Sequence, residues 1–278
     1  MLFGIAYRML GSVMDAEDVV QEAYLRWERA DREGIESPRA YLSTIVTRLS
    51  IDALREAKRR REVYVGEWLP EPLVTGRDPR EAAELADSLS TAFLVLLESL
   101  SPPERAAFLL REVFGYDYAE LANVLEKSEN NCRQMVSRAR GRLETREPRF
   151  EASREEQERL LAQFIDATTS GNYDALVDVL AEDAAVYSDH GGKAAAAQRT
   201  IVGADKIARF FLGIQKRFPP ADPSVRMVSL NGRPGAIVFS GDKPDSAFSF
   251  EVGPRGIARI FVVRNPDKLK HLAAAVAE

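Results

Sequence analysis

Six polar side chains within residues 128–138 have the chemistry needed to bind the base edges and phosphates of DNA. Arginine, asparagine and glutamine form bidentate hydrogen bonds with bases, and arginine and serine also bind phosphates. The set consists of Asn130, Asn131, Arg133, Gln134, Ser137 and Arg138. At helical spacing these residues share one side of the chain, while Cys132, Val136 and Leu143 share the other. An ordinary solvated helix has the same pattern, so this segment alone leaves both interpretations open.

The elements that must position this set are two helices joined by a short turn. Leu121, Ala122 and Leu125 recur at helical spacing in the first helix. Ser128 is the expected N-cap of the second helix, and Glu129 follows in its first turn, where acid favours the helix dipole. This pattern is typical of a helix-turn-helix, whose second helix enters the major groove.

The composition is that of a globular protein with about two domains. The chain has 278 residues, of which 45% are hydrophobic and 29% charged. One cysteine excludes an intramolecular disulfide, and no Cys/His cluster suggests a zinc site. The net charge of −5 argues against a protein that coats DNA through a global positive field. No stretch approaches membrane-spanning length. We therefore expect a cytoplasmic protein with no metal, no cofactor and no membrane association.

Two amphipathic helices are predicted nearer the N-terminus. In residues 15–31, Val19, Ala23 and Trp27 form an apolar stripe, and Asp15 is the expected cap. The opposite face is acidic and is interpreted either as solvent cover or as a docking surface for a basic partner. It presents Glu17, Asp18, Gln21 and Glu22.

The second helix is expected to begin with Ser37 as cap and Pro38 at its first position. Its predicted buried side consists of Leu42, Ile45, Val46, Leu49 and Ala53. Its polar stripe consists of Thr44, Arg48, Asp52, Arg55 and Arg59, and it ends in the basic cluster Lys58, Arg59, Arg60 and Arg61. These charges either pair along the helix or offer cations to phosphate, and the spacing permits both.

Glycine and proline mark residues 62–79 as a linker, in which the apolar Trp68 and Leu69 need a packing partner. Helices are predicted again over 80–100 and from Ser101–Pro102, and the charged stretch 144–158 marks a second boundary. Beyond it we expect two helices within 155–183, a strand at 184–189, a helix at 203–218 and strands at 225–231, 235–241, 247–252 and 256–265. Such a series predicts an α+β domain with an antiparallel sheet.

Three of these segments, in this order, resemble extracytoplasmic-function sigma factors of the sigma-70 family. Residues 15–27 resemble the family's core-polymerase docking helix, residues 41–55 its minus-ten helix and residues 100–143 its minus-thirty-five helix-turn-helix. The rest of the chain is similar to the subgroup with a SnoaL-like extension. WLPEP at 68–72, DHGGK at 189–193 and NPDKL at 265–269 carry that similarity.

The resemblance implies two all-α domains followed by an α+β NTF2/SnoaL-like, cone-shaped domain. The implied limits are 1–62 for sigma region 2, 63–80 for the linker, 81–147 for region 4 and 148–278 for the SnoaL-like domain. The implied function is promoter-specific transcription initiation with core RNA polymerase, regulated in cis by the extension. The sequence departs from the family pattern in two places. The first helix is expected to be short. Glu126 stands where glycine is common, and a left-handed backbone at this residue would cost about 1 kcal/mol of stability.

The resemblance also implies roles for individual residues. Polymerase binding falls to Asp15, Glu17, Asp18, Gln21 and Glu22. The residues implied to bind the minus-ten single strand are Arg48, Asp52, Arg55, Lys58, Arg59, Arg60 and Arg61. The residues implied to bind the minus-thirty-five duplex are the six polar residues of the second helix named above, from Asn130 to Arg138. Interdomain regulation falls to Trp68, Leu69, Pro70, Asp189, His190, Gly191, Gly192, Lys193, Asn265, Pro266, Asp267, Lys268 and Leu269.

Other functions stay open at this point. The main alternative is a SnoaL-like isomerase or cyclase fused to a DNA-binding domain, with Asp183, Tyr187, Asp189 and His190 as an acid/base set. A repressor that binds duplex DNA without polymerase is a third hypothesis. Six phenylalanines could line a small-molecule cavity or simply form core: Phe164, Phe210, Phe211, Phe239, Phe248 and Phe261.

Overall fold

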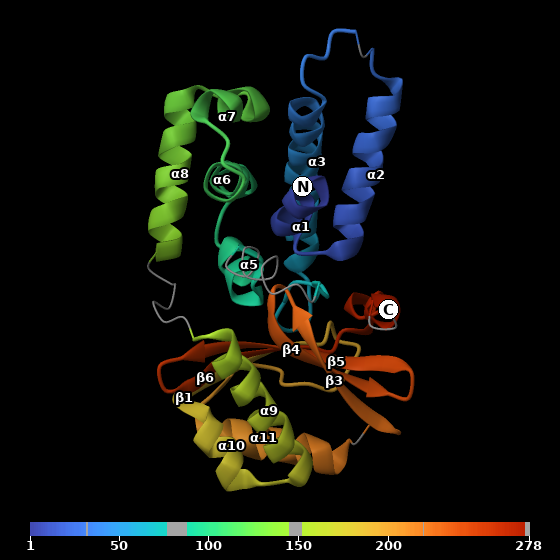
Figure 1. The fold of residues 1–278 in the computed structure, drawn as a ribbon, viewed down its shortest axis with the longest axis vertical. Helices are drawn as coiled ribbons and strands as arrows, with labels where there is room; N and C mark the ends of the chain where they lie inside the picture. The colour runs from blue at the N-terminus through green and yellow to red at the C-terminus, as the bar shows by residue number, and fades with distance from the viewer. Residues whose placement is uncertain (32, 77–87, 145–151, 219, 276–278) are drawn as a thin grey trace. The chain divides into compact units, whose positions relative to one another are not determined.

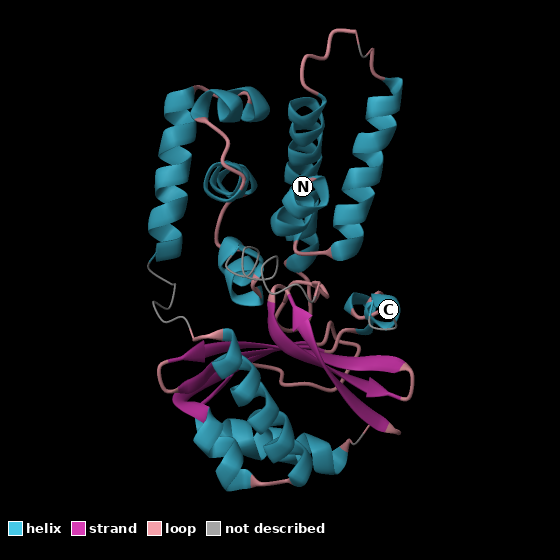
Figure 2. Cartoon of the chain, in the orientation of Figure 1, coloured by secondary structure: helices cyan, strands magenta, loops and turns pink. Residues whose placement is uncertain are grey.

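The computed structural model describes residues 1–31, 33–76, 88–144, 152–218 and 220–275, which divide into two compact units. The first unit contains residues 1–63 and the described residues from Phe93 to Glu144, and it is helical (Figure 1). The second contains the described parts of 64–92 and of the chain from Ala152, and it holds all the named strands (Figure 2). The expected fold class is confirmed. The domain limits at 80–81 and 147–148 lie outside the described residues.

The helices of the first unit begin where the sequence provides caps. Ser37 Oγ accepts the Ala40 N–H (3.3 Å), and Ser128 Oγ accepts the Asn131 N–H (3.3 Å), so both predicted caps are confirmed. Each such cap stabilises a helix by about 1 kcal/mol. The elements are α1 (Leu2–Leu10), α2 (Val13–Arg29), α3 (Pro38–Arg61), α5 (Thr91–Leu97), α6 (Pro102–Phe108), the π-helical η1 (Leu109–Val113), α7 (Tyr118–Leu125) and α8 (Glu129–Glu144). Of the helix predicted over 80–100, residues 80–87 lie outside the described residues.

The predicted cap of α2 is wrong by one turn. Ser12 is the N-cap, and its Oγ accepts the N–H of Asp15 (3.1 Å), which lies inside the helix. The helix begins at Val13 because the apolar Val13 and Ala16 are buried and extend the packed side beyond the acidic stretch. Asp15 instead contributes its charge to the first helical turn.

The buried side of α3 is also rotated from its predicted position. Of the five apolar residues expected there, only Val46 is buried, and the other four are half-buried. The buried set is Ser43, Val46, Thr47, Ser50, Ile51, Leu54 and Ala57. Ser43, Thr47 and Ser50 are small enough to fit this interface, and Ser43 Oγ donates to Arg39 O (2.7 Å) within the helix. A prediction based on hydrophobicity alone therefore placed the interface on the wrong set of residues.

The helix-turn-helix follows its prediction closely. Leu121 of α7 is fully buried and Ala122 and Leu125 are half-buried, while α8 buries Cys132, Met135, Val136, Ala139 and Leu143. The turn residue Glu126 has φ 53° and ψ 49°, so its backbone is left-handed, the case in which a residue other than glycine costs about 1 kcal/mol. This conformation lets the Glu126 N–H bond to Ala122 O and ends α7.

The second unit is a six-stranded sheet with helices on one face (Figure 1). The strand order is β2-β1-β6-β5-β4-β3. The elements are α9 (Arg154–Ser170), α10 (Tyr173–Val179), β1 (Leu180–Asp189), β2 (Ile201–Val202), α11 (Ala204–Arg217), β3 (Pro223–Leu230), β4 (Arg233–Ser240), β5 (Lys243–Gly253), β6 (Gly256–Val263), the 3-10 turn η2 (Pro266–Lys268) and α12 (Leu272–Ala275). Its core joins Leu161 and Phe164 of α9 and Phe211 of α11 to apolar residues of the sheet.

Two expectations for this unit are wrong. Residues 180–183, predicted to end the second helix, begin β1, because Leu180 and Ala181 are buried in the sheet. The sheet is mixed, since β1 pairs in parallel with β6 although β3, β4, β5 and β6 pair in antiparallel order. The helix α11 lies between β1 and the last four strands in the chain, and such a crossover permits a parallel pair.

Candidate nucleic-acid interface

All six side chains predicted to read the minus-thirty-five duplex are exposed on the outer face of α8. The helix is held by its buried side, which packs against α6 and α7. Two of the arginines have intramolecular partners: Arg133 pairs with Glu129 (2.8 Å) and lies over the Tyr118 ring (4.6 Å), and Arg138 lies 3.5 Å from Glu104. Because both arginine side chains are at least half-exposed, these contacts are weak enough to exchange for DNA.

The cations of α3, by contrast, differ among themselves in exposure and partners. Arg55 pairs with Asp52 (2.7 Å) on the exposed stripe, and Arg59 lies 3.5 Å from Glu56. Arg60 is exposed as well. Part of the predicted minus-ten surface is therefore accessible to a nucleic-acid strand.

Arg48, in the middle of α3, contacts the end of α7. Its Nε donates to Val124 O (2.9 Å) and its Nη2 to Asn123 O (3.0 Å), while Nη1 pairs with Glu126 (2.8 Å). The last carbonyls of a helix have no partner within it, so a cation there satisfies them and complements the helix dipole. A residue predicted to bind the minus-ten strand thus stabilises the turn of the helix-turn-helix.

Lys58 and Arg61, at the end of α3, also donate to backbone carbonyls of other segments of this unit. Lys58 Nζ donates to Leu100 O (2.6 Å) and Glu98 O (3.3 Å). Arg61 donates to Leu10 O (2.9 Å) and pairs with the Glu98 carboxylate (2.5 Å). Burial, together with the nearby Arg105, lowers the pKa of Lys58. These two cations are structural in this unit, and the sequence did not predict that.

Glu98 and Arg105 form the centre of this contact and were missed from the sequence. Arg105 is 1% exposed and donates to Met9 O, Leu97 O and the Glu98 carboxylate, each at 2.7 Å. Burial alone would raise the pKa of Glu98, but the charges of Arg105 and Arg61 hold it below its ordinary value. The signal in the sequence was an arginine directly before the apolar run 106–110.

The acidic face of α2 has the predicted arrangement. Glu17, Asp18 and Gln21 are exposed, Asp15 is half-exposed, and Glu22 pairs with Arg26 (2.8 Å). Such exposed pairs contribute little to stability, so this face is available to a partner.

In the second unit, the predicted regulatory segments meet at the buried carboxylate of Asp189, which is 0% exposed. Tyr64 OH (2.5 Å) and the Leu69 N–H (2.8 Å) donate to it, and Lys268 Nζ pairs with it (2.6 Å). Lys268 Nζ also donates to Leu69 O (2.5 Å) and lies over the Trp68 ring (4.2 Å). We call this group the Asp189 clamp: Asp189 and Lys268 with Tyr64, Trp68 and Leu69.

Of the two apolar linker residues predicted to need a packing partner, Leu69 is the one that is fully buried. Leu69 is 2% exposed and Pro70 is buried, whereas Trp68 is only half-buried and contacts the Lys268 ammonium group. Burial, and then the hydrogen bond to Asp189, raise the pKa of Tyr64 well above its ordinary value, so this phenol stays a donor.

DHGGK and NPDKL also meet through Asn265, whose Nδ2 donates to Tyr64 OH (2.8 Å). A side chain at Gly191 would lie 2.4 Å from that amide, so glycine is needed there for both space and its φ of 55°. Gly192 lies beside Val65 of the linker, where an added Cβ would make only an ordinary van der Waals contact (3.4 Å). Lys193 pairs with Asp267, and the hydrogen bond lowers the pKa of Asp267. Leu269 is buried, and Pro266 begins η2.

His190 is 2% exposed, and its Nδ1 accepts the Gly192 N–H (3.0 Å). Its Nε2 faces Gly66 of the linker, where an added Cβ would lie 2.6 Å away. The predicted acid/base set is not assembled: Asp183 is exposed and pairs with Arg255 (3.1 Å), and Tyr187 stacks on Phe261. Asp189 is occupied by the clamp.

A second set of linker contacts was not predicted. Leu73 O accepts the Asn231 N–H (2.8 Å), and Ser229 O accepts the Thr75 N–H (2.9 Å), which attaches the linker to the β3–β4 hairpin as a short antiparallel bridge. Nearby, His271 Nε2 donates to Pro72 O (2.7 Å). The available signal was Asn231-Gly232, a hairpin-turn pair, but a turn sequence does not reveal its distant partner.

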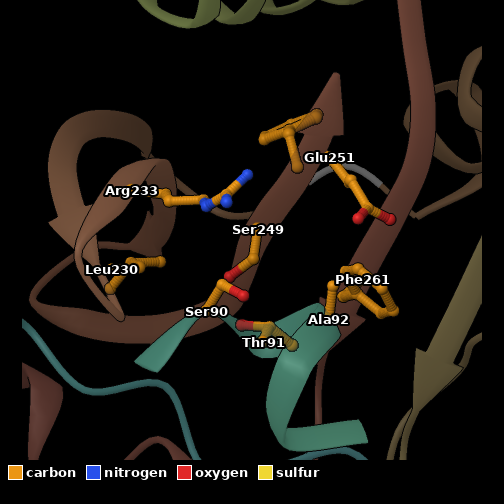
Figure 3. Close-up of a pocket in the computed structure, with 9 residues that line it drawn as sticks. Ser90, Thr91, Ala92, Leu230, Arg233, Ser249, Glu251 and Phe261 are labelled. Carbon is orange, nitrogen blue, oxygen red and sulfur yellow. The ribbon is translucent and has the colours of Figure 1, made fainter. Parts of the chain in front are cut away.

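Beyond the bridge, residues Ser90–Ala92 line a small pocket of about 10 Å³ in the second unit (Figure 3). The sheet contributes Leu230, Arg233, Ser249, Phe250, Glu251 and Phe261. This volume holds one water molecule at most. The pocket is therefore a small gap where residues 90–92 pack against the sheet, and it is too small for a ligand.

Among the described residues, no group of histidine, cysteine, aspartate and glutamate side chains could hold a metal ion. No described helix is both long and apolar enough to cross a membrane.

Two family models match the chain: Sigma-70 region 2 over residues 1–60 and Sigma-70 region 4 over residues 90–143. The ECF RNA polymerase sigma factor SigJ of Mycobacterium tuberculosis is 42% identical, over 96% of this chain and 89% of SigJ. The probable ECF RNA polymerase sigma factor SigI of the same organism is 31% identical, over 98% and 92%. The crystal structure of SigJ is similar with a TM-score of 0.77 and 34% identity, over 98% of this chain and 95% of that one.

Proposed function

The chain belongs to the extracytoplasmic-function sigma factors of the sigma-70 family, and from this premise we propose that it binds core RNA polymerase and selects promoters through α3 and α8. The observation that carries the proposal is the outer face of α8, where six base- and phosphate-binding side chains are exposed on a helix whose other side is packed. As a polymerase subunit, the protein acts in the cytoplasm.

We assign the individual roles as follows. The acidic face of α2 docks on the polymerase, and the outer face of α8 reads the minus-thirty-five duplex. On α3, Arg55, Arg59 and Arg60 receive the opened minus-ten strand, since exposed cations follow phosphates. The net charge of −5 disfavours DNA binding by the free chain, so recognition depends on the polymerase.

Run-off transcription with purified core polymerase tests this function. Full-length protein is expected to give a discrete transcript from its promoter, and Gln134→Ala to reduce it about fivefold or more, because a bidentate base contact contributes about 1–3 kcal/mol. Gln163→Ala on α9 is the matched control, since Gln163 is an exposed glutamine outside the proposed interface. No selective transcript with full-length protein would contradict the proposal. Tight promoter binding without polymerase would favour a repressor instead.

We further propose that the C-terminal domain regulates initiation in cis through the Asp189 clamp. The clamp and the β3–β4 bridge hold residues 64–75, the segment that joins the region 2 helices to the rest of the chain. Residues held in this way cannot extend freely, so the clamp limits how far apart two DNA-binding regions can move.

Trp68→Ala and Tyr64→Phe test the regulatory role, because the first removes the ring under Lys268 and the second removes the phenol that donates to Asp189. Each is expected to change promoter output severalfold. Val63→Ala is the matched control, since Val63 is an exposed residue at the start of the linker and outside the clamp. Transcription that is unchanged in both variants would remove the regulatory proposal while leaving the sigma function intact.

The relatives are transcription factors, and the acid/base set proposed for an enzyme is not assembled. We therefore do not propose catalysis for the C-terminal domain. Turnover by the full-length protein, lost on substitution of His190, would reverse that conclusion.

A further inference from the structure

A cavity of about 260 Å³ lies in the second unit between α9, α11 and the sheet. Four aromatic rings line it: Phe164, Phe211, Phe248 and Phe250. Phe164 packs edge-on against Phe211 (5.2 Å between centroids) and Phe250 (5.3 Å). None of the described residues that line this lobe is charged.

The wall differs from the one predicted from the sequence. Phe164, Phe211 and Phe248 line the larger lobe, and Phe210 lines an adjoining lobe of about 140 Å³. Phe239 and Phe261 line neither lobe, because alternate residues of a strand point to opposite faces. Phe261 instead stacks on Tyr187 (5.4 Å).

The adjoining lobe gives the cavity a polar end. Ser188 and Ser246 line it and are 3% and 4% exposed. Asp245 and Arg264 line it too, but Arg264 Nη2 donates to both carboxylate oxygens of Asp245 (2.8 and 3.0 Å). Because these two charges neutralise each other, the lobe offers hydroxyl groups without a free charge. An ionic ligand would lose its hydration there without gaining a counter-charge.

The size and lining define a class of ligand. An apolar cavity of about 150 Å³ accommodates benzene, so the larger lobe has room for about two fused rings. The aromatic wall favours a flat apolar body, and the serine hydroxyls favour one hydroxyl or carbonyl group at its end.

The polar end of the cavity adjoins the Asp189 clamp along two strands. On β1, Ser188 lines the cavity and the next residue, Asp189, enters the clamp. After β6, Arg264 lines the cavity and Asn265 donates to Tyr64 OH. The backbone N–H groups of Arg264 (2.7 Å) and Asn265 (3.1 Å) both donate to Asp189 O. A ligand that orders Ser188 and Arg264 therefore orders the residues that hold the linker.

We propose that this cavity binds an uncharged, flat, mostly apolar molecule with one hydroxyl or carbonyl group, and that its occupancy strengthens docking of residues 64–75. The second half of this inference rests on the proposed regulatory role of the clamp. The coupling is reciprocal, so a linker that docks more tightly also raises affinity for the ligand.

The first experiment is calorimetric titration of the full-length protein with 2-naphthol, an uncharged fused-ring phenol, and with 2-naphthoate, its anionic counterpart. We expect 2-naphthol to bind at least tenfold more tightly. Val238→Phe fills both lobes from a half-buried position and should abolish binding. Val225→Phe, at the exposed end of the larger lobe, should also weaken binding, and it does not alter a core position. Equal binding of the two probes, or binding that survives both substitutions, would overturn the ligand class and the site.

Hydrogen exchange tests the coupling in the same samples. The amides of Leu69 and Thr75 donate to Asp189 and Ser229, so their exchange reports linker docking directly. With 2-naphthol bound, we expect severalfold slower exchange in residues 64–75, and no change in Val238→Phe. Binding without this protection would overturn the coupling. The sigma function is tested without any probe, so its failure is distinguishable from failure of the ligand site.

Discussion

The polar faces of α3 and α8 are both rich in arginine, yet they differ in what those arginines contact. On α8 the predicted DNA-binding side chains are exposed, and Arg133 and Arg138 pair with carboxylate side chains, not with backbone carbonyls. On α3, Arg48, Lys58 and Arg61 donate to backbone carbonyls of other segments of the same unit. The DNA-binding side chains of α8 are therefore accessible in this structure. Three of the six predicted cations of α3 would first have to release backbone carbonyls.

This difference separates two uses of a cation. A charged side chain that donates to helix-end carbonyls stabilises the fold, and one that remains in solvent binds phosphate at little cost in stability. Substitutions on the two kinds of position should therefore have opposite profiles, with a large effect on unfolding for one and on DNA binding for the other.

The largest effect is expected at the contact that Lys58 and Arg61 share with Glu98. Glu98→Ala leaves Arg105, which is 1% exposed, without its carboxylate, and breaking a buried ion pair in this way costs about 3–5 kcal/mol. The free energy of unfolding in urea measures it. Glu22→Ala is the control, because Glu22 belongs to an exposed pair with Arg26 that contributes about 0.5 kcal/mol or less. A loss for Glu98→Ala no larger than that of the control would contradict a structural role for this contact.

The same contact predicts how stability depends on acid. The pKa of Glu98 is lower in the folded protein than its ordinary value of 4.5, so the folded state favours the ionised form. Its contribution is fully present above pH 4.5 and is lost as the pH falls through the lower, folded pKa. Urea midpoints measured from about pH 7 down to about pH 3 should fall more steeply for the natural protein than for Glu98→Gln. Parallel curves would mean that Glu98 is not the group responsible.

Single substitutions within α3 sharpen the comparison further. Lys58→Ala removes two bonds to carbonyls and should lower the free energy of unfolding by about 1–2 kcal/mol. Arg60→Ala should leave stability unchanged but reduce holoenzyme binding to a template with an open minus-ten region, with the salt dependence falling by about 0.7 in log–log slope. Urea unfolding and binding over a salt series measure the two effects. Equal stability losses in the two variants would remove the distinction between them.

The features that sequence alone predicted are those that local chemistry determines. The caps Ser37 and Ser128 follow from side chains within a few residues of one another. The outer face of α8 follows from helical spacing in the same way. The left-handed position of Glu126 was suggested instead by the family resemblance, because glycine is common there. The α+β character of the C-terminal domain follows from the series of predicted helices and strands. The sigma and SnoaL-like folds, and the shared role of the WLPEP, DHGGK and NPDKL segments, came from the family resemblance, whose motifs span the whole chain.

What the sequence did not predict depends on distant partners. No local pattern shows that Thr75 bonds to Ser229, or that Arg48 reaches the carbonyls of Asn123 and Val124. The buried side of α3 was misplaced because Ser43 and Thr47 are polar by composition yet buried by packing. A basic cluster read as a DNA-binding surface can equally be a set of internal donors, and only the folded contacts distinguish the two.

The smallest effect, and the finest test of the comparison, lies at the point where the two surfaces touch. Glu126 has φ 53° and pairs with Arg48, so its residue type affects both the turn and the cation. Glu126→Ala and Glu126→Gly both remove the carboxylate, but only glycine adopts the left-handed backbone without strain, so the glycine variant should be more stable by about 1 kcal/mol. Urea unfolding measures that difference. Because both variants leave Arg48 with its carbonyl partners alone, they should bind the open minus-ten template equally well, and slightly better than the natural protein. A gain in binding confined to the glycine variant would instead mean that the geometry of the turn, and not release of Arg48, limits access to α3.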